Sequence, residues 1–178
     1  DKEPNQAGLD FYRSVFEECH KYNIEPLVSI WHFDTSLALE ENYGGWKNRK
    51  LIDFYIRYCE VIFNEYKDLV KDWLTFNEIN NKTIFLDMFG SKASDADYQE
   101  GYQILHHQFV VSAKAVQIGH AINPDFMIGN MICGITFYLG ICDPADILAN
   151  EHKWQSGIYY CCDVQAKGKY GTYAKRLW

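Results

Sequence analysis

The chain has 178 residues and carries 17 Lys and Arg against 24 Asp and Glu, a formal net charge of −7. This length suits one domain or a part of one. With 48% hydrophobic and 23% charged residues, the chain has enough apolar material for a packed core, which excludes general disorder. A pI near 5.3, without a run of five Lys or Arg, argues against nucleic acid or an anionic membrane as a partner.

Neither a membrane span nor a targeting segment is predicted. The longest apolar stretch, 126–142, is shorter than the roughly 20 residues that a spanning helix needs, and glycines interrupt it. The chain begins at Asp1 without an initiator Met or a basic-then-apolar pattern. We therefore expect it to be cut from a longer protein.

The six cysteines are predicted to be reduced thiols, which is typical of a cytoplasmic protein. There is no C-x-x-C pair, and a chain of this size needs no disulfide staples. The spacing of Cys133, Cys142, Cys161 and Cys162 matches no structural zinc pattern, so no metal is expected. The sequence has no G-x-G-x-x-G and no Walker loop, and no cofactor is expected.

The first half of the chain alternates helical and strand patterns. Apolar residues recur at helical spacing from Leu9 to Cys19, which predicts a helix capped at Asn23. The segment 27–31 is short, apolar and rich in β-formers, as is typical of a buried parallel strand. An amphipathic pattern over 51–66 predicts a second helix.

The alternation continues after this helix. A second strand is predicted at 73–76. Ser94, with Asp97 three residues later, resembles a capping box that begins a third helix, and this helix is expected to stop near Gly119.

The last part of the chain is predicted to contain one more strand and one more helix. The strand covers 126–132, and Asp143-Pro144 opens a helix that runs to about residue 153. Beyond Tyr159, only a helix start near Gly171 is predicted.

Strands that alternate with helices imply a parallel α/β arrangement. The three long loops expected after the strands, 32–46, 77–97 and 133–143, lie at the end of the sheet where parallel folds place their active sites. Functional residues should therefore follow the strands directly.

Polar residues do follow the first two strands. Glu78 stands among Asn77, Asn80 and Asn81, a cluster able to bind a polyhydroxylated ligand and hold a carboxyl, although an acid here is also compatible with a solvated loop. His32 either contacts a ligand or is a half-buried histidine with its hydrogen bonds satisfied. Asp34 is able to orient that imidazole, cap the next segment or sit in water, and no role is assigned to it.

These segments together resemble the retaining β-glycosidases of glycoside hydrolase family 1. The resemblance rests on Ser29-Ile30-Trp31-His32-Phe33-Asp34, Tyr43-Gly44-Gly45-Trp46-Lys47-Asn48-Arg49 and Trp73-Leu74-Thr75-Phe76-Asn77-Glu78. The Thr-Phe-Asn-Glu motif at the end of the fourth barrel strand is a specific signature of the family. The resemblance covers almost the whole chain, but well under half of a full family member.

The resemblance implies a fold. Residues 1–178 would form a single partial TIM (β/α)8-barrel domain, truncated at both ends, with about three parallel strands and flanking helices from the third to fifth units. A barrel segment exposes strand edges, so the isolated chain is expected to self-associate.

The resemblance also implies residue roles. Glu78 matches the general acid/base, Asn77 the residue that bonds the sugar 2-hydroxyl, and His32 a contact to the sugar in the −1 subsite. Retaining glycosidases use a second carboxylate about 5 to 5.5 Å away as nucleophile. The family's Thr-Glu-Asn-Gly type motif, which carries it, does not occur here, so the chain alone is expected to be inactive.

Within the family, Asn-Glu-Ile-Asn from Asn77 and His-Phe-Asp from His32 resemble the bacterial 6-phospho-β-glucosidases, which are cytoplasmic. The implied substrate is a phosphorylated β-glucoside. Two alternatives stay open. One is a non-catalytic barrel fragment with a partial sugar-binding surface or a scaffold role, and the other is an ordinary β-glucosidase or β-galactosidase of the family.

Overall fold

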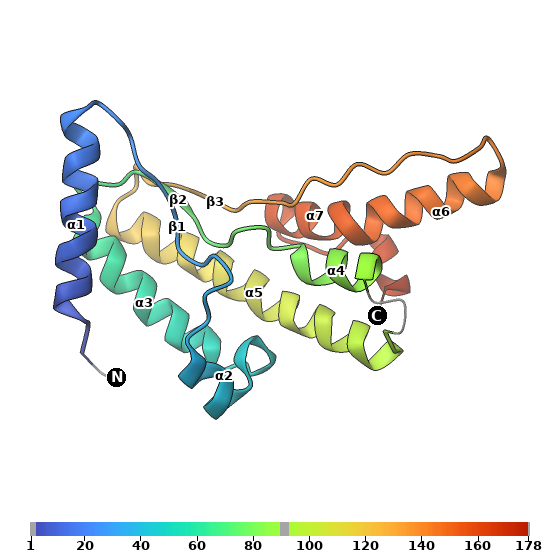
Figure 1. Cartoon of the computed structure of the whole chain (residues 1–178), viewed down its shortest axis with the longest axis horizontal. Helices are drawn as coiled ribbons and strands as arrows, with labels where there is room; N and C mark the ends of the chain where they lie inside the picture. The colour runs from blue at the N-terminus through green and yellow to red at the C-terminus, as the bar shows by residue number, and fades with distance from the viewer. Residues whose placement is uncertain (1–2, 90–92, 178) are drawn as a thin grey trace. The chain divides into compact units, whose positions relative to one another are not determined.

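The computed structural model describes residues 3–89 and 93–177 (Figure 1). The chain divides into two compact units, the first made of Asp1–Asn77 and Val110–Asn130 and the second of Glu78–Phe109 and Met131–Trp178. We describe each unit by itself. Within the described ranges, no helix combines the length and the apolar character that crossing a membrane requires.

The first unit contains a three-stranded parallel sheet in the order β1-β2-β3. The strands are β1 (Leu27–Ser29), β2 (Asp72–Leu74) and β3 (Met127–Gly129). They confirm the predicted parallel arrangement, but each is shorter than its sequence pattern. Pairing beyond the strand ends continues through single bonds, such as Ile30 N–H to the Leu74 carbonyl at 2.8 Å.

Helix α1 (Gln6–Lys21) precedes β1 and ends as predicted. Asn23 adopts a positive φ of 56°, and the Ile24 N–H bonds back to the Cys19 carbonyl at 3.0 Å, which closes the helix end. The predicted helix over 51–66 is confirmed as α3 (Leu51–Tyr66).

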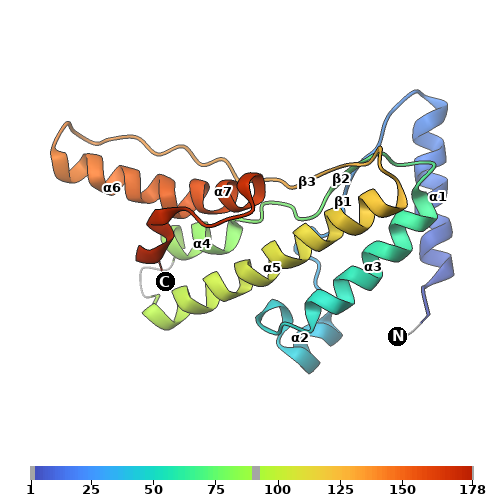
Figure 2. The same ribbon diagram turned by 180° about the vertical axis from the view of Figure 1, so that it is seen from behind.

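The core of the first unit lies between the sheet and the helices on one side of it. Phe63 of α3 is fully buried, with ring-centroid distances of 5.0 Å to Trp73 and 5.5 Å to Phe126. Figure 2 shows α3 and the end of α5 (Asp95–Ile122) on the same side of the strands. Burial of these large aromatic rings makes an apolar contribution to the stability of this unit.

Helix α5 runs three residues past Gly119, where its end was expected. The sequence predicted a stop near this glycine, but the helix continues to Ile122. A Cβ atom at Gly119 would collide with the Ile128 side chain, so the glycine permits close approach of α5 to β3 rather than ending the helix.

Two segments expected as loops contain helices. The segment after β1 includes α2 (Leu37–Tyr43) and the 3₁₀-helix η1 (Gly45–Lys47), joined by Gly44 at a φ of 74°. The segment after β2 includes α4 (Asn81–Phe89). Their short, weakly periodic sequences explain why the pattern alone did not identify them.

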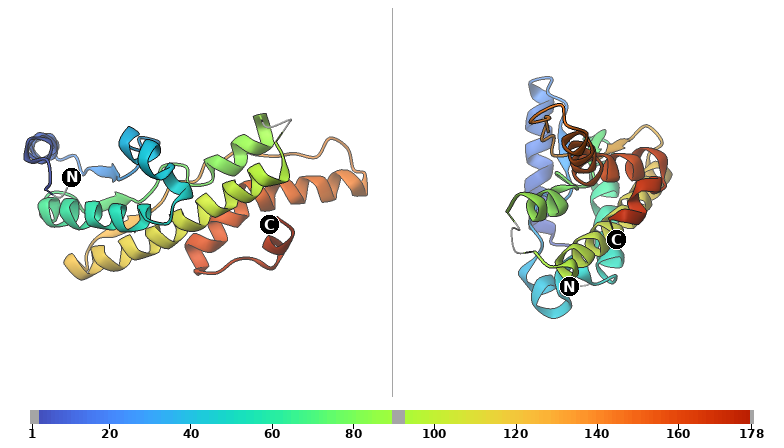
Figure 3. Two further views of the ribbon diagram at one scale, coloured as in Figure 1. Left: turned by 90° about the horizontal axis from the view of Figure 1, so that it is seen from below. Right: turned by 90° about the vertical axis from the view of Figure 1, so that its right-hand side faces the viewer.

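The second unit is helical apart from its connecting segments. It contains α4, the first part of α5, α6 (Pro144–Trp154), the π-helix η2 (Gln155–Tyr159), α7 (Tyr160–Lys167) and the 3₁₀-helix η3 (Thr172–Arg176). Figure 3 shows α6 and α7 following one another. The sequence missed the π-helix and α7, whereas η3 confirms a start near Gly171.

Both helix starts predicted from capping residues are confirmed. The Asp97 N–H donates to Ser94 Oγ at 3.3 Å, and the Ser94 N–H donates to Asp97 Oδ2 at 2.8 Å. At α6, Asp143 Oδ1 accepts the Ala145 N–H at 2.8 Å. Each cap satisfies a backbone donor that the helix itself leaves unpaired.

Candidate active site

Backbone pairing beyond the strand ends places two of the three candidate residues, His32 and Asn77, in neighbouring segments of the first unit. Ser29 and Leu74 pair at the ends of β1 and β2. Beyond them, the Asn77 N–H donates to the Trp31 carbonyl at 2.9 Å. His32 follows Trp31 directly, so the structure brings His32 and Asn77 together beyond the carboxyl ends of β1 and β2.

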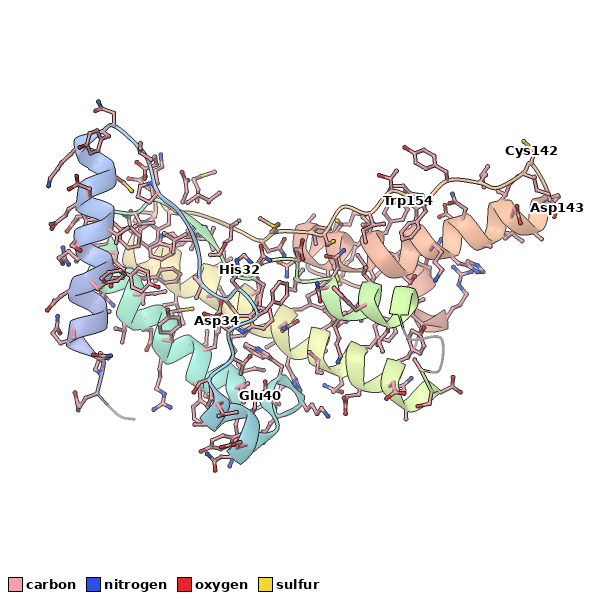
Figure 4. The ribbon with its side chains drawn as sticks, in the orientation of Figure 1. His32, Asp34, Glu40, Cys142, Asp143 and Trp154 are labelled. Carbon is pink, nitrogen blue, oxygen red and sulfur yellow. The ribbon has the colours of Figure 1, made fainter. Side chains whose placement is uncertain are left out.

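His32 and Asn77 differ in exposure. Asn77 is 5% exposed, whereas His32 lies on the surface in a tight turn (Figure 4). In this turn Phe33 has a φ of 66°, and the His32 backbone N–H donates to Asp34 Oδ1 at 2.9 Å. This bond to the backbone of the His32 turn was not among the roles considered for Asp34.

An aromatic cluster packs around the segments that carry His32 and Asn77. Trp31 and Phe76 have ring centroids 5.5 Å apart, and Trp46 lies 5.3 Å from Phe76. Tyr55 stacks on Phe76 at 5.2 Å, and its hydroxyl donates to the Thr75 carbonyl. Three residues of the quoted motifs, Trp31, Trp46 and Phe76, therefore form one packed group.

The large cavity of the first unit is a different feature. Its volume is about 870 Å³, and it is lined by residues of α1, β1 and α3, among them Tyr12, Val28 and Tyr58. Neither His32 nor Asn77 lines it. The cavity is therefore separate from these two candidate residues.

Glu78, the third candidate, is the first residue of the second unit and directly follows Asn77 in the chain. It is half-buried and has a φ of 44°, a conformation that costs a non-glycine residue of order 1–3 kcal/mol. Its carboxylate accepts a bond from Asn81 Nδ2 at 3.3 Å. Strain of this kind clusters at functional sites, which makes this turn a functional candidate.

Asn80 ties the Glu78 turn to two distant segments of the second unit. The side chain is fully buried. Its Oδ1 accepts the Cys133 N–H at 2.8 Å, and its Nδ2 donates to the carbonyls of Cys133 at 3.0 Å and Gly157 at 2.7 Å. We expected Asn80 in a ligand-binding cluster, but these three bonds join parts of the chain.

Cys133 is a neighbour of Glu78 that the sequence analysis missed. Burial is the main cause that raises the pKa of its thiol, followed by the negative charge of Glu78 and a hydrogen bond with it. The sequence signal was its position directly after the third strand. Among the described residues, no group of three or more His, Cys, Asp or Glu side chains is placed to hold a metal ion.

Parallel strands with flanking helices and polar residues beyond the strand ends define an enzyme-like α/β fold. A model of the family described as Glycosyl hydrolase family 1 matches residues 1–178. The chain belongs to glycosyl hydrolase family 1, and its strands and helices form part of a (β/α)8 barrel.

Named relatives are similar over nearly the whole chain. The 6-phospho-beta-glucosidase of Clostridium longisporum is 46% identical over 180 residues, which cover 99% of this chain and 38% of the relative. The 6-phospho-beta-glucosidase AscB of Escherichia coli (strain K12) is 45% identical and is matched over 98% of this chain and 37% of its own length. The chain thus spans less than two fifths of these relatives.

Solved structures give the same family and fold. The family 1 b-glucosidase from Thermotoga maritima in complex with isofagomine lactam is 27% identical and superposes with a TM-score of 0.85. The match covers 98% of this chain and 41% of that chain. The predicted fold class, a partial barrel with three parallel strands, is therefore confirmed.

Replacement of Asn80 tests its structural role. Asn80→Ala should lower the free energy of unfolding by about 2 kcal/mol, because the peptide groups of Cys133 and Gly157 lose their partner. Asn81→Ala, the matched control, should cost about 0.5–1 kcal/mol because it removes one longer bond. Urea unfolding followed by circular dichroism measures both, and equal losses would contradict the assignment.

Proposed function

We propose that Glu78 is the general acid/base of a retaining β-glycosidase that acts on 6-phospho-β-glucosides, with Asn77 and His32 as sugar contacts. The observation that carries this proposal is the position of Glu78. It stands just beyond the central strand β2 of a family 1 chain, in the motif Thr75-Phe76-Asn77-Glu78. Parallel barrels place their catalytic residues beyond this end of the strands.

The proposed chemistry needs a proton donor that later acts as a base. Glu78 protonates the glycosidic oxygen as the bond to the sugar breaks, and its carboxylate then takes a proton from the water that releases the sugar. A second carboxylate must attack the anomeric carbon. We place this nucleophile in the part of the family fold that the chain does not span, so the 178-residue polypeptide should be inactive by itself.

The proposed substrate class follows from the relatives. Two proteins named 6-phospho-beta-glucosidases are 46% and 45% identical to the chain, whereas the b-glucosidase of solved structure is 27% identical. The motif Asn77-Glu78-Ile79-Asn80, which resembles that of the bacterial 6-phospho-β-glucosidases, also supports a phosphorylated substrate. We also propose a cytoplasmic location, which agrees with six free cysteines, all within the described residues.

Glu78→Gln tests the proton donor in a polypeptide of full family length. Turnover of glycosides with poor leaving groups should fall about 10²- to 10⁴-fold, because an amide donates no proton to the leaving oxygen. The glycosylation step on activated aryl glycosides should be spared, since such leaving groups depart without protonation. Asp34→Asn is the matched control, and any change that it causes in turnover should be the same for both kinds of glycoside. Equal losses on both substrates in Glu78→Gln would contradict the assignment.

Two aryl β-glucosides, with and without a 6-phosphate, test the substrate class. We expect no hydrolysis by the 178-residue polypeptide and a strong preference for the phosphorylated sugar in a polypeptide of full family length. Preference for the unphosphorylated sugar would refute the proposal that the substrates are 6-phospho-β-glucosides. It would leave the family membership intact. Hydrolysis by the short polypeptide would show that it holds a second carboxylate, with Asp34 the first to replace.

The isolated 178-residue polypeptide should also self-associate. In the described sheet, β1 and β3 each pair with β2 and with no other strand, so each has one edge available for another chain. Light scattering should show dimers or larger species that increase with concentration. A monodisperse monomer over the same concentrations would refute this proposal.

A further inference from the structure

The large cavity of the first unit, which neither His32 nor Asn77 lines, has the size of a small-molecule site. Its volume of about 870 Å³ lies within the roughly 300–1,000 Å³ that is typical of ligand pockets. Residues of α1, β1, α2 and α3 line it, so the first unit provides the whole lining by itself. Ligand pockets combine aromatic and apolar walls with a few placed polar groups, and this cavity has both.

Two tyrosines from different helices give the cavity exposed aromatic surface. Tyr12 of α1 is 55% exposed and Tyr58 of α3 is 51% exposed, and both line the cavity. Tyr12 stacks on the buried Phe16 at a centroid distance of 6.2 Å, so one face of its ring is packed against the protein. A ligand with an apolar face would remove the exposed parts of these rings from water, which is favourable.

Polar side chains of the lining have hydrogen-bonding groups that no other described residue uses. Asp34, on the segment between β1 and α2 (Figure 4), accepts the His32 N–H with Oδ1, and its Oδ2 is left as an acceptor. Asn42 donates through Nδ2 to a backbone carbonyl of α2 at 2.8 Å, which leaves its Oδ1. The Arg57 guanidinium lies 5.2 Å from the Phe54 ring centroid, and no residue in the described ranges accepts its N–H groups.

The charges of the lining favour an uncharged ligand. Arg57 contributes a positive charge, whereas Asp34 and Glu3 contribute negative charges. A cation would be repelled by Arg57 and an anion by the two carboxylates, so neither kind of ion gains the full attraction of an oppositely charged site. A sugar ring is uncharged, and its hydroxyls both donate and accept hydrogen bonds, while its C–H faces pack on aromatic rings.

We propose that this cavity is a second carbohydrate site, which binds a neutral saccharide apart from the candidate active site. Tyr12 and Tyr58 pack on the sugar faces. Asp34 accepts hydrogen bonds from the sugar hydroxyls, and Arg57 donates to them. The proposal does not rest on the proposed function, because binding here requires neither hydrolysis nor Glu78.

Titration of the 178-residue chain with cellobiose, followed by protein NMR, tests this site. Tyr12→Ala and Tyr58→Ala should each raise the Kd about threefold to tenfold, because each removes a ring that packs on the sugar. Tyr58→Phe should keep the affinity because it keeps the ring. Tyr22→Ala is the matched control and should have no effect, because Tyr22 is 69% exposed at the end of α1 and does not line the cavity.

The outcomes that would overturn the second site are equally direct. They are the absence of saturable binding, and an affinity that Tyr12→Ala and Tyr58→Ala leave unchanged. An equal loss in Tyr22→Ala would also overturn it, because the sugar would then bind exposed tyrosines in general. Urea unfolding of each variant shows that a loss of binding is not a loss of fold.

Cellobiose 6-phosphate and His32→Ala separate this site from the candidate active site. The phosphate should weaken binding in the cavity because it meets the carboxylates of Asp34 and Glu3, whereas we propose that the candidate active site prefers a phosphorylated sugar. His32→Ala should leave cellobiose binding unchanged, because His32 does not line the cavity. Tighter binding of the phosphorylated sugar, or loss of binding in His32→Ala, would overturn the second site. Absence of hydrolysis by a polypeptide of full family length would refute only the proposed function.

Discussion

The common register of three parallel strands is the constraint on which the candidate site depends. Ser29 pairs with Leu74, which pairs with Gly129, so β1, β2 and β3 end at the same level. The segments that follow the strands therefore all begin at the carboxyl ends of the sheet. The bond from the Asn77 N–H to the Trp31 carbonyl continues the pairing beyond these ends. Residues far apart in sequence come to one edge because their strands run in one direction.

Three asparagines around Glu78 show how one polar motif divides into different roles. Asn77 is buried beyond the end of β2, Asn80 joins the turn to Cys133 and Gly157, and Asn81 contacts the carboxylate itself. A fully buried amide with three bonds is costly to disturb, because each of its partners would lose a hydrogen bond. The position of the candidate acid is thus coupled to the packing of the second unit.

The sequence predicted the features that depend on local patterns and missed those that depend on distant contacts. Helix α3 and the starts of α5 and α6 follow from periodicity and capping residues, and family motifs identified His32, Asn77 and Glu78 as candidates. The π-helix Gln155–Tyr159 was not predicted, and its Gly157 carbonyl accepts a bond from Asn80, 77 residues earlier. Similarly, the bonds from Asn80 to the Cys133 backbone join residues 53 positions apart in the chain.

Azide rescue of Glu78→Ala, in a polypeptide of full family length, would show whether Glu78 is the acid/base. Without its base, the variant should accumulate the glycosyl-enzyme formed from an activated aryl 6-phospho-β-glucoside. Azide needs no deprotonation, so it should attack the anomeric carbon, displace the enzyme carboxylate and accelerate turnover with a β-glycosyl azide as product. No acceleration, or an α-glycosyl azide, would contradict the claim, and the latter would identify Glu78 as the nucleophile.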